Sequence, residues 1–300
     1  MEMNRIRRCL LLLGSVYILG STLSLHSAAD PVLVGAGDIA SCTSAGDEAT
    51  AKLLDQIDGT VFTLGDNVYE AGTATEFTQC YEPSWGRHKS RTRPAVGNHE
   101  YFTPEAQGYF NYFGNAAGDP LKGYYSYDIG TWHVVVLNSV CGLVGGCDVG
   151  SSQEQWLRAD LAAHPTSCLI AYWHHPRSTM QALTEDLYEA GVDIVLNGHL
   201  HYYERFLPQN AGDVADPNHG FRKFIVGTGG RGHGTLDPAS PLSEVRNNDT
   251  FGVLKLTLHA TSYDWNFIPE AGKMFSDAGQ DTCSAVLQRS HVIFLPRIER

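Results

Sequence analysis

The sequence predicts an α/β protein in which stacked sheets, covered by helices, form one domain. Short apolar runs each lead into a polar or glycine-rich loop, as buried strands do; they lie at 32–34, 61–64, 133–137, 169–173 and 194–196. Helical patterns separate some of these runs, whereas the chain after residue 220 is rich in strand patterns at 221–226, 251–258 and 261–268. Stacking sheets under helices lets both kinds of element bury their apolar sides.

Three segments have the pattern of helices. Residues 47–57 bring their apolar side chains to one side. The run from Ser151 to Glu154 is typical of a capping box, which would open the second helix. Residues 181–190 form the third, and Gly191 is placed to end it.

The first residues predict an export signal. Arg5, Arg7 and Arg8 precede an apolar run at 9–19, and small residues follow up to Ala29. The alternative is an uncleaved membrane anchor, but the run is short against the roughly 20 apolar residues of a bilayer span. We expect residues 1–29 to be a signal peptide, residues 30–283 a catalytic domain, and residues 284–300 a tail of unknown role. The mature protein would be secreted, periplasmic or extracellular, with no stable membrane span.

The cysteines agree with export. Six remain after cleavage, and an even number in an exported chain indicates disulfides. Cys141 and Cys147 flank a glycine-rich stretch that a local bridge would close. Pairs Cys42–Cys80 and Cys168–Cys283 would complete three, although six cysteines allow 15 connectivities and free buried thiols are the alternative.

The net charge of the chain limits which classes of molecule it is expected to bind. The 300 residues carry 33 Asp and Glu against 21 Lys and Arg, a formal net charge of −12. Because phosphate backbones are bound by clustered Lys and Arg, a long nucleic acid is not an expected partner. A small phosphoester stays compatible with this charge, since bound metal ions can reverse the local field.

Metal-binding side chains lie at the ends of five short segments, four of which are predicted strands. These ends read Gly37-Asp38, Gly65-Asp66-Asn67-Val68-Tyr69, Gly97-Asn98-His99-Glu100, His174-His175 and Gly198-His199-Leu200-His201. In sheets of this kind, ligands gather at the carboxyl ends of the strands. Carboxylates, an amide oxygen and imidazoles suit divalent or trivalent metals. The donors are too many for one ion with an open position, and two ions sharing a carboxylate are suited to phosphoryl displacement. Each motif alone is weak, but the five in order predict a dimetal site.

Together these motifs resemble the calcineurin-like metallophosphoesterase superfamily. Tyr69 makes them most similar to purple acid phosphatases, as do the stretches 198–206 and 226–230. The resemblance covers most of residues 31–283 and implies a four-layer α/β/β/α sandwich with a dimetal centre at the carboxyl ends of the strands. One departure is Ala40, where the family usually has glycine.

The resemblance also implies a role for each motif residue. The first metal, Fe(III), would be held by Asp38, Asp66, Tyr69 and His201. The second, which is Fe, Zn or Mn, would be held by Asp66, Asn98, His174 and His199, so that Asp66 bridges the two. His174 is preferred to His175 because the family places its ligand two residues before a proline.

The implied activity is metal-dependent hydrolysis of phosphomonoesters by a metal-bound hydroxide, as in acid phosphatases. His99 would protonate the leaving group or stabilise the phosphoryl charge, and its alternative role is to orient Asn98. Candidate substrate contacts are His175, Arg205, Arg231 and His233, with a structural ion pair as the alternative for Arg205. Two other functions stay open: a phosphodiesterase acting on nucleotide or lipid head-group esters, and a metal-stabilised binding protein with a decayed site. The seven intact ligand positions argue against decay.

Overall fold

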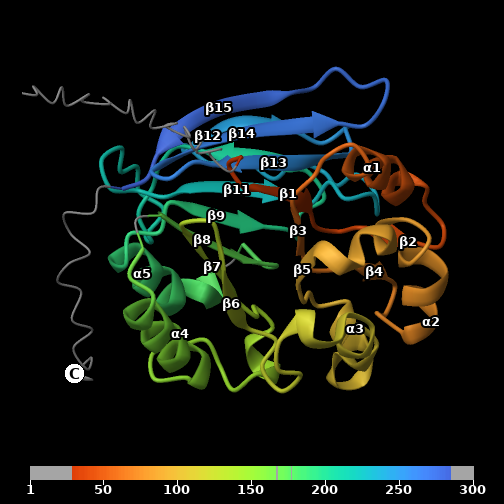
Figure 1. Ribbon diagram of the computed structural model, residues 1–300, viewed down its shortest axis with the longest axis horizontal. Coiled ribbons are helices and arrows are strands. Elements are labelled where there is room, and N and C mark those ends of the chain that lie inside the picture. The colour runs from red at the N-terminus through yellow and green to blue at the C-terminus, as the bar shows by residue number, and fades with distance from the viewer. Residues whose placement is uncertain (1–28, 167, 177, 285–300) are drawn as a thin grey trace, which may run out of the picture.

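The computed structural model describes residues 29–166, 168–176 and 178–284, and in it two sheets stack against each other (Figure 1). One core cluster draws buried residues from both sheets, including Leu33 and Val61 from one and Ile170 and Leu196 from the other. This arrangement confirms the predicted α/β sandwich. The predicted signal segment, except Ala29, and the predicted tail, except Ser284, lie outside the described residues.

The first sheet has six strands in the order β15-β14-β13-β1-β3-β5. Their bounds are β1 Val32–Ala36, β3 Thr60–Leu64, β5 Thr92–Ala95, β13 Gly252–Leu258, β14 Ser262–Pro269 and β15 Asp277–Thr282. Strands β1, β3 and β5 are parallel, so their carboxyl ends lie at one edge.

The second sheet has seven strands in the order β12-β10-β11-β9-β8-β7-β6. Their bounds are β6 Tyr125–Ile129, β7 Trp132–Val136, β8 Cys168–Trp173, β9 Ile194–Asn197, β10 Tyr203–Phe206, β11 Arg222–Val226 and β12 Ser243–Asn247. Strands β7, β8, β9 and β11 are parallel. Strands β7, β8 and β9 are buried along their whole length, which explains why they appear in the sequence as continuous apolar runs. A third, two-stranded sheet pairs β2 (Ala40–Ser41) with β4 (Val68–Tyr69).

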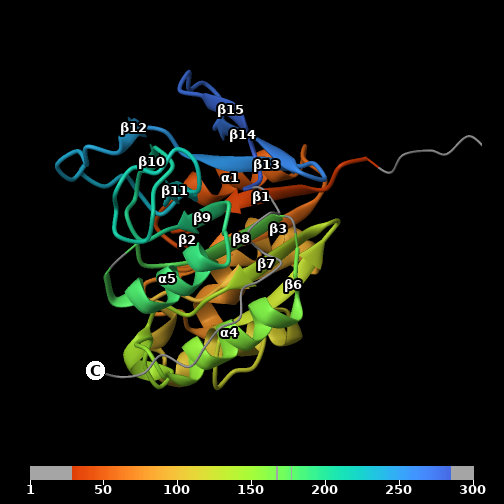
Figure 2. The same cartoon turned by 90° about the vertical axis from the view of Figure 1, so that its left-hand side faces the viewer.

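Helices lie outside the two sheets. Helices α4 (Ser152–Ala163) and α5 (Gln181–Glu189) bury Leu157, Leu161, Leu183 and Leu187 against the outer face of the seven-stranded sheet (Figure 2). The others are α1 (Gly46–Leu54), α2 (Ala74–Glu76) and α3 (Gln107–Phe113). Shorter turns are the π-helical η1 (Phe77–Tyr81) and the 3-10 turns η2 (Trp85–Arg91), η3 (Glu100–Phe102), η4 (Pro104–Ala106), η5 (Gly114–Ala117), η6 (Cys141–Leu143) and η7 (Ser178–Met180).

Helix ends follow the sequence signals in most details. The Ser151 side chain accepts a hydrogen bond from the Glu154 N–H at 3.3 Å, as the predicted box requires. The Glu154 carboxylate, however, accepts from the Gly150 N–H at 3.1 Å and not from Ser151, so the box is half-formed. Gly191 ends α5 with φ +75° and donates its N–H to the Tyr188 carbonyl at 2.9 Å. Helix α1 ends at Leu54, three residues earlier than predicted.

All three predicted disulfides are confirmed. Cys42–Cys80, Cys141–Cys147 and Cys168–Cys283 bridge Cα atoms that lie 5.0, 5.3 and 5.4 Å apart. The last one ties the start of β8 to the residue after β15, and therefore joins the two sheets. Within the described part of the chain, none of the helices combines the length and the apolar character that crossing a membrane requires.

Candidate metal centre

The loops that follow β1, β3, β5, β8 and β9 meet at one edge of the sandwich. They carry Asp38, Asp66, Asn98, His174 and His199 in that order. The parallel strands deliver these side chains together, because the carboxyl ends of parallel strands share an edge. The structure thus brings together the seven predicted metal-ligating side chains in two adjoining groups.

The first group surrounds the Tyr69 hydroxyl. This oxygen lies 2.9 Å from Asp38 Oδ1, 3.0 Å from Asp66 Oδ2 and 3.2 Å from His201 Nε2. His201 Nε2 also lies 3.2 Å from Asp38 Oδ1. Two carboxylates and an imidazole therefore converge within hydrogen-bonding distance of one phenol oxygen.

The second group surrounds His174 Nε2. This nitrogen lies 3.2 Å from Asp66 Oδ2, 3.1 Å from Asn98 Oδ1 and 3.2 Å from His199 Nδ1. His174 Nδ1 donates to the Leu64 carbonyl at 2.7 Å, which leaves Nε2 as the atom turned to the group. Asp66 Oδ2 is thus the atom that both groups share.

The backbone at three of these residues is strained. Asp38, Asp66 and His199 have φ values of 59°, 49° and 71°, in the left-handed region that side chains other than glycine seldom adopt. The conformation is held by neighbouring bonds: the Asp38 N–H donates to Gly65 O at 3.1 Å, and the His199 N–H donates to Asp38 Oδ2 at 2.8 Å. Strain of this kind concentrates at functional sites.

Glycines leave room for the two carboxylates. A Cβ on Gly97 would lie 2.2 Å from Asp66 Oδ1, and one on Gly198 would lie 2.9 Å from Asp38 Oδ2. The glycines that open the Asn98 and His199 motifs are therefore required by the close approach of a carboxylate.

Glu100 is a site residue to which the sequence analysis assigned no role. Its fully buried carboxylate accepts four backbone N–H bonds, from Asp66 at 3.0 Å, Asn67 at 2.6 Å, Val68 at 3.4 Å and Gly97 at 2.7 Å. Burial and the nearby Asp66 carboxylate raise the pKa of Glu100 to about 7. Glu100 fixes the loops of Asp66 and Asn98 to each other. Its place directly after His99 in the motif was the available signal in the sequence.

The buried carboxylates of the two groups attract positively charged partners. Burial opposes ionisation of Asp66, but His174 and His99 outweigh burial and hold the pKa of Asp66 below its ordinary value. Burial likewise opposes the charged form of His174, yet Asp66 raises the pKa of His174 to about 9. Burial, Asp38 and Asp66 raise the pKa of Tyr69 well above its ordinary value, so its phenol keeps its proton unless a strong cation is bound.

The donor set therefore fits two metal ions. Asp38 and Asp66 are at most 2% exposed, and the ionic partners that the described residues offer them are histidines. Buried carboxylates need a counter-charge, and these donors of oxygen and imidazole nitrogen suit divalent and trivalent ions.

His99 lies at the rim of the cluster. Its ring packs on Tyr69 with centroids 4.3 Å apart, and its backbone N–H donates to Asp66 Oδ1 at 2.9 Å. Its Nδ1 donates to the Glu70 carbonyl at 2.6 Å, because a carbonyl can only accept. Its Nε2, which lies 3.9 Å from Asp66 Oδ2, is therefore the atom that can exchange a proton.

Three of the four predicted substrate contacts lie close to the cluster. The His175 ring is 4.4 Å from that of His199. Arg231 lies 4.9 Å from the centre of the Tyr69 ring and donates to Glu70 Oε1 at 2.8 Å. His233 stacks on Phe251 at 4.0 Å and remains exposed. It follows Arg231 in the same loop.

Arg205 occupies the position of a structural ion pair. Its Nε donates to Asp277 Oδ2 at 2.7 Å, it also pairs with Glu244, and its guanidinium lies 5.1 Å from the Trp265 ring. These partners on β12, β14 and β15 account for the contacts of the guanidinium and favour the structural ion pair as the role of Arg205.

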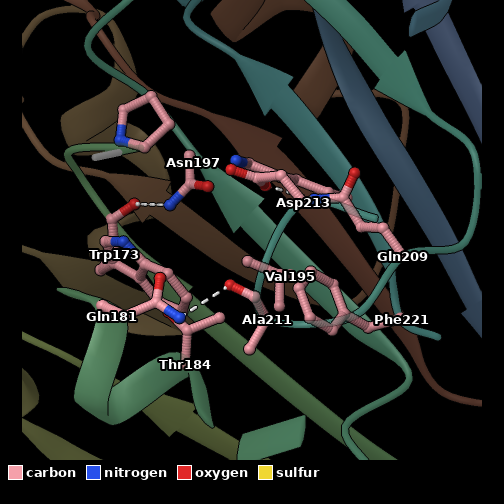
Figure 3. A pocket seen from close by; sticks show the side chains of 11 residues that line it. Trp173, Gln181, Thr184, Val195, Asn197, Gln209, Ala211, Asp213 and Phe221 are labelled. Atoms are coloured by element: carbon pink, nitrogen blue, oxygen red, sulfur yellow. Dashed lines mark hydrogen bonds between the residues drawn. The ribbon is translucent and has the colours of Figure 1, made fainter. Parts of the chain in front are cut away.

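A separate pocket of about 90 Å³ lies between helix α5, strands β8 and β9 and the loop before β11 (Figure 3). Trp173, Val195, Asn197 and Phe221 are among its lining residues, and Asn197 Nδ2 donates to the Trp173 carbonyl at 3.1 Å. Successive strand residues point to opposite faces, so Trp173 faces the helices while His174 faces the other sheet. The pocket therefore lies on the opposite face of the sheet from His174.

A further histidine, His133, joins strands β6 and β7 to helix α4. Its Nδ1 lies 2.7 Å from Asp128 Oδ1 and its Nε2 lies 2.9 Å from Asp160 Oδ2. Burial opposes the charged form, but the hydrogen bonds to Asp160 and Asp128 outweigh it and raise the pKa of His133.

Comparison with known proteins connects this geometry to a family. A family model described as calcineurin-like phosphoesterase matches residues 31–203. Purple acid phosphatase 22 of Arabidopsis thaliana is 35% identical over 150 residues, which cover 43% of this chain and 32% of that protein. Purple acid phosphatase 21 of the same plant is 30% identical over 193 residues, covering 56% and 41%. The matched segments span about a third to two fifths of the length of these curated relatives.

Solved structures show the same fold. A purple acid phosphatase from seeds of yellow lupin (Lupinus luteus) aligns with a TM-score of 0.67 over 85% of this chain and 54% of that one, at 18% identity. GAP50, described as the anchor in the inner membrane complex of Plasmodium, aligns with a TM-score of 0.61 over 88% and 94%, at 12% identity. At these identities the likeness extends to the fold alone.

Proposed function

Since the chain belongs to the calcineurin-like phosphoesterase family, we propose that it is a secreted dimetal phosphatase that hydrolyses phosphomonoesters, as purple acid phosphatases do. The observation that carries this proposal is Asp66 Oδ2, which adjoins both donor groups, one containing Tyr69 and the other Asn98. A shared carboxylate between two such groups is the arrangement that a dimetal phosphoryl-transfer site requires.

The ligands divide between the two metals as the groups do. Asp38, Asp66, Tyr69 and His201 would hold Fe(III), because a phenolate oxygen suits a hard trivalent ion; Asp66, Asn98, His174 and His199 would hold Fe, Zn or Mn. When bound, the metals supply a Lewis acid for the phosphoryl oxygens and lower the pKa of water.

Residues of this chain complete the reaction. His99 Nε2 gives a proton to the leaving oxygen, since Nδ1 is committed to the Glu70 carbonyl. Arg231, held by Glu70 beside Tyr69, attracts the phosphate anion, and His175 and His233 contact its outer oxygens. Glu100 keeps the loops of Asp66 and Asn98 in register.

Secretion would explain both the apolar first segment of the chain and its three disulfides. We infer that residues 1–29 are a signal peptide, that residues 30–283 form the catalytic domain, and that residues 284–300 are a tail. Three disulfides support an oxidising compartment.

Metal analysis of the purified protein, combined with a panel of phosphomonoesters and bis-esters, tests the proposal. We expect two metals per chain, one of them iron, and faster turnover of the monoesters. Asp66→Ala should abolish hydrolysis because both metals lose a ligand, whereas near-parental turnover in this variant would refute the assignment. Preference for bis-esters would indicate a phosphodiesterase. Bound metal with no hydrolysis of any ester would indicate a binding protein.

A further inference from the structure

Phe102 is an exposed aromatic side chain beside the candidate catalytic residue. It is 63% exposed, and the other large apolar residues exposed to this degree within the described chain are aliphatic. Its ring lies 4.9 Å from that of His99, edge to face, and the His99 ring lies 4.3 Å from that of Tyr69. Three rings, which we call the ring row (Tyr69, His99 and Phe102), thus lead from the metal ligands to the surface.

The turn that carries Phe102 is held firmly. Phe102 ends the 3-10 turn Glu100–Phe102, and its N–H donates to the His99 carbonyl at 3.2 Å. The buried Glu100 carboxylate anchors the start of this turn. Just after it, the Thr103 hydroxyl donates to the Ala71 carbonyl at 2.7 Å. The exposed ring is therefore presented from a fixed backbone, which lowers the entropy lost when a ligand packs on it.

We propose that Phe102 forms an aromatic subsite for the leaving group, so that the preferred substrates are phosphomonoesters of phenols and other flat aryl alcohols. This inference rests on the proposed function. The leaving oxygen lies next to His99 Nε2 when it takes the proton, and the group bonded to that oxygen continues along the ring row. An aryl group there comes within the 4.5–7 Å at which aromatic rings attract each other, whereas a short alkyl group has little surface to offer.

The test compares phenyl phosphate with ethyl phosphate in the metal-loaded protein. For each ester, kcat/KM of Phe102→Ala is divided by the parental value, so that the intrinsic reactivity of the ester cancels. We expect the ratio for phenyl phosphate to fall about two- to tenfold, the range of one aromatic pair, and that for ethyl phosphate to change less than twofold. Phe102→Trp should keep the preference. Val214→Ala, at a residue 58% exposed in the loop before β11, is the matched control and should leave both ratios near one.

Two outcomes would overturn the subsite. Equal losses for both esters would show that Phe102 positions His99, and unchanged values for both would show that the aryl group does not reach Phe102. Binding of phenylphosphonate and methylphosphonate, measured by calorimetry, separates this question from the proposed function. If the parent hydrolyses no ester, the proposed function fails; the subsite then stands only if the parent binds phenylphosphonate more tightly than methylphosphonate and Phe102→Ala removes the difference.

Discussion

Replacing Gly97 by alanine should disturb the candidate metal centre without replacing any of its ligands. The new Cβ would lie 2.2 Å from Asp66 Oδ1 and 2.3 Å from the Asp66 backbone nitrogen. Ordinary contacts of this kind begin well above 3 Å, so the Asp66 carboxylate must retreat by about 1 Å. Gly97 does not occupy the left-handed region, so the variant tests this steric effect and not a backbone preference.

The expected loss follows from that displacement. A 1 Å shift of a group that both metals share should lower turnover by about a hundredfold. Overpacking should also cost about 1–3 kcal/mol in the free energy of unfolding. Metal content after dialysis, initial rates on a phosphomonoester and urea unfolding measure the three effects. Gly142→Ala is the matched control, because a Cβ there meets nothing within 4 Å. If Gly97→Ala retains two metals and turns over within twofold of the parent, the tight cradle around Asp66 has no functional role.

Three further predictions concern other residues. His99→Ala should retain both metals and lose about 10²- to 10⁴-fold in rate; a parallel loss of metal would instead assign His99 to orienting Asn98. Tyr69→Phe should remove the visible absorption band of the iron-loaded protein, and an active parent that contains no iron would exclude the purple type of centre. His133→Gln should flatten the pH dependence of stability. Because the folded pKa of His133 is raised, its pairing stabilises the fold below about pH 6.5, and this contribution is lost as pH rises through the folded pKa. Urea unfolding of parent and variant from pH 6 to 9 measures this effect, and parallel curves would contradict it.

Local pattern was sufficient to locate the ligand motifs and strands β1, β3, β7, β8, β9, β11, β13 and β14, but not strands β5, β6, β10, β12 and β15. A buried parallel strand is a short apolar run, and its polar or glycine-rich end can be identified without knowing its neighbours. For this reason Asp38, Asp66, Asn98, His174 and His199 could be found as a set, and the structure brings them to one edge. The half-formed box at α4 shows the limit of such signals, because Glu154 could satisfy Gly150 as readily as Ser151.

The sequence by itself determined which side chains could bind metal, since their chemistry and their places at strand ends are local properties. Tertiary structure decided which distant groups meet. Glu100 became a site residue because folding brings two loops around its carboxylate, and Arg205 became an ion-pair partner because Asp277 arrives 72 residues later. Phe102 is exposed for the same kind of reason, because no distant segment of the described chain packs over it. Such partners depend on long-range packing, which residue spacing along the chain does not encode.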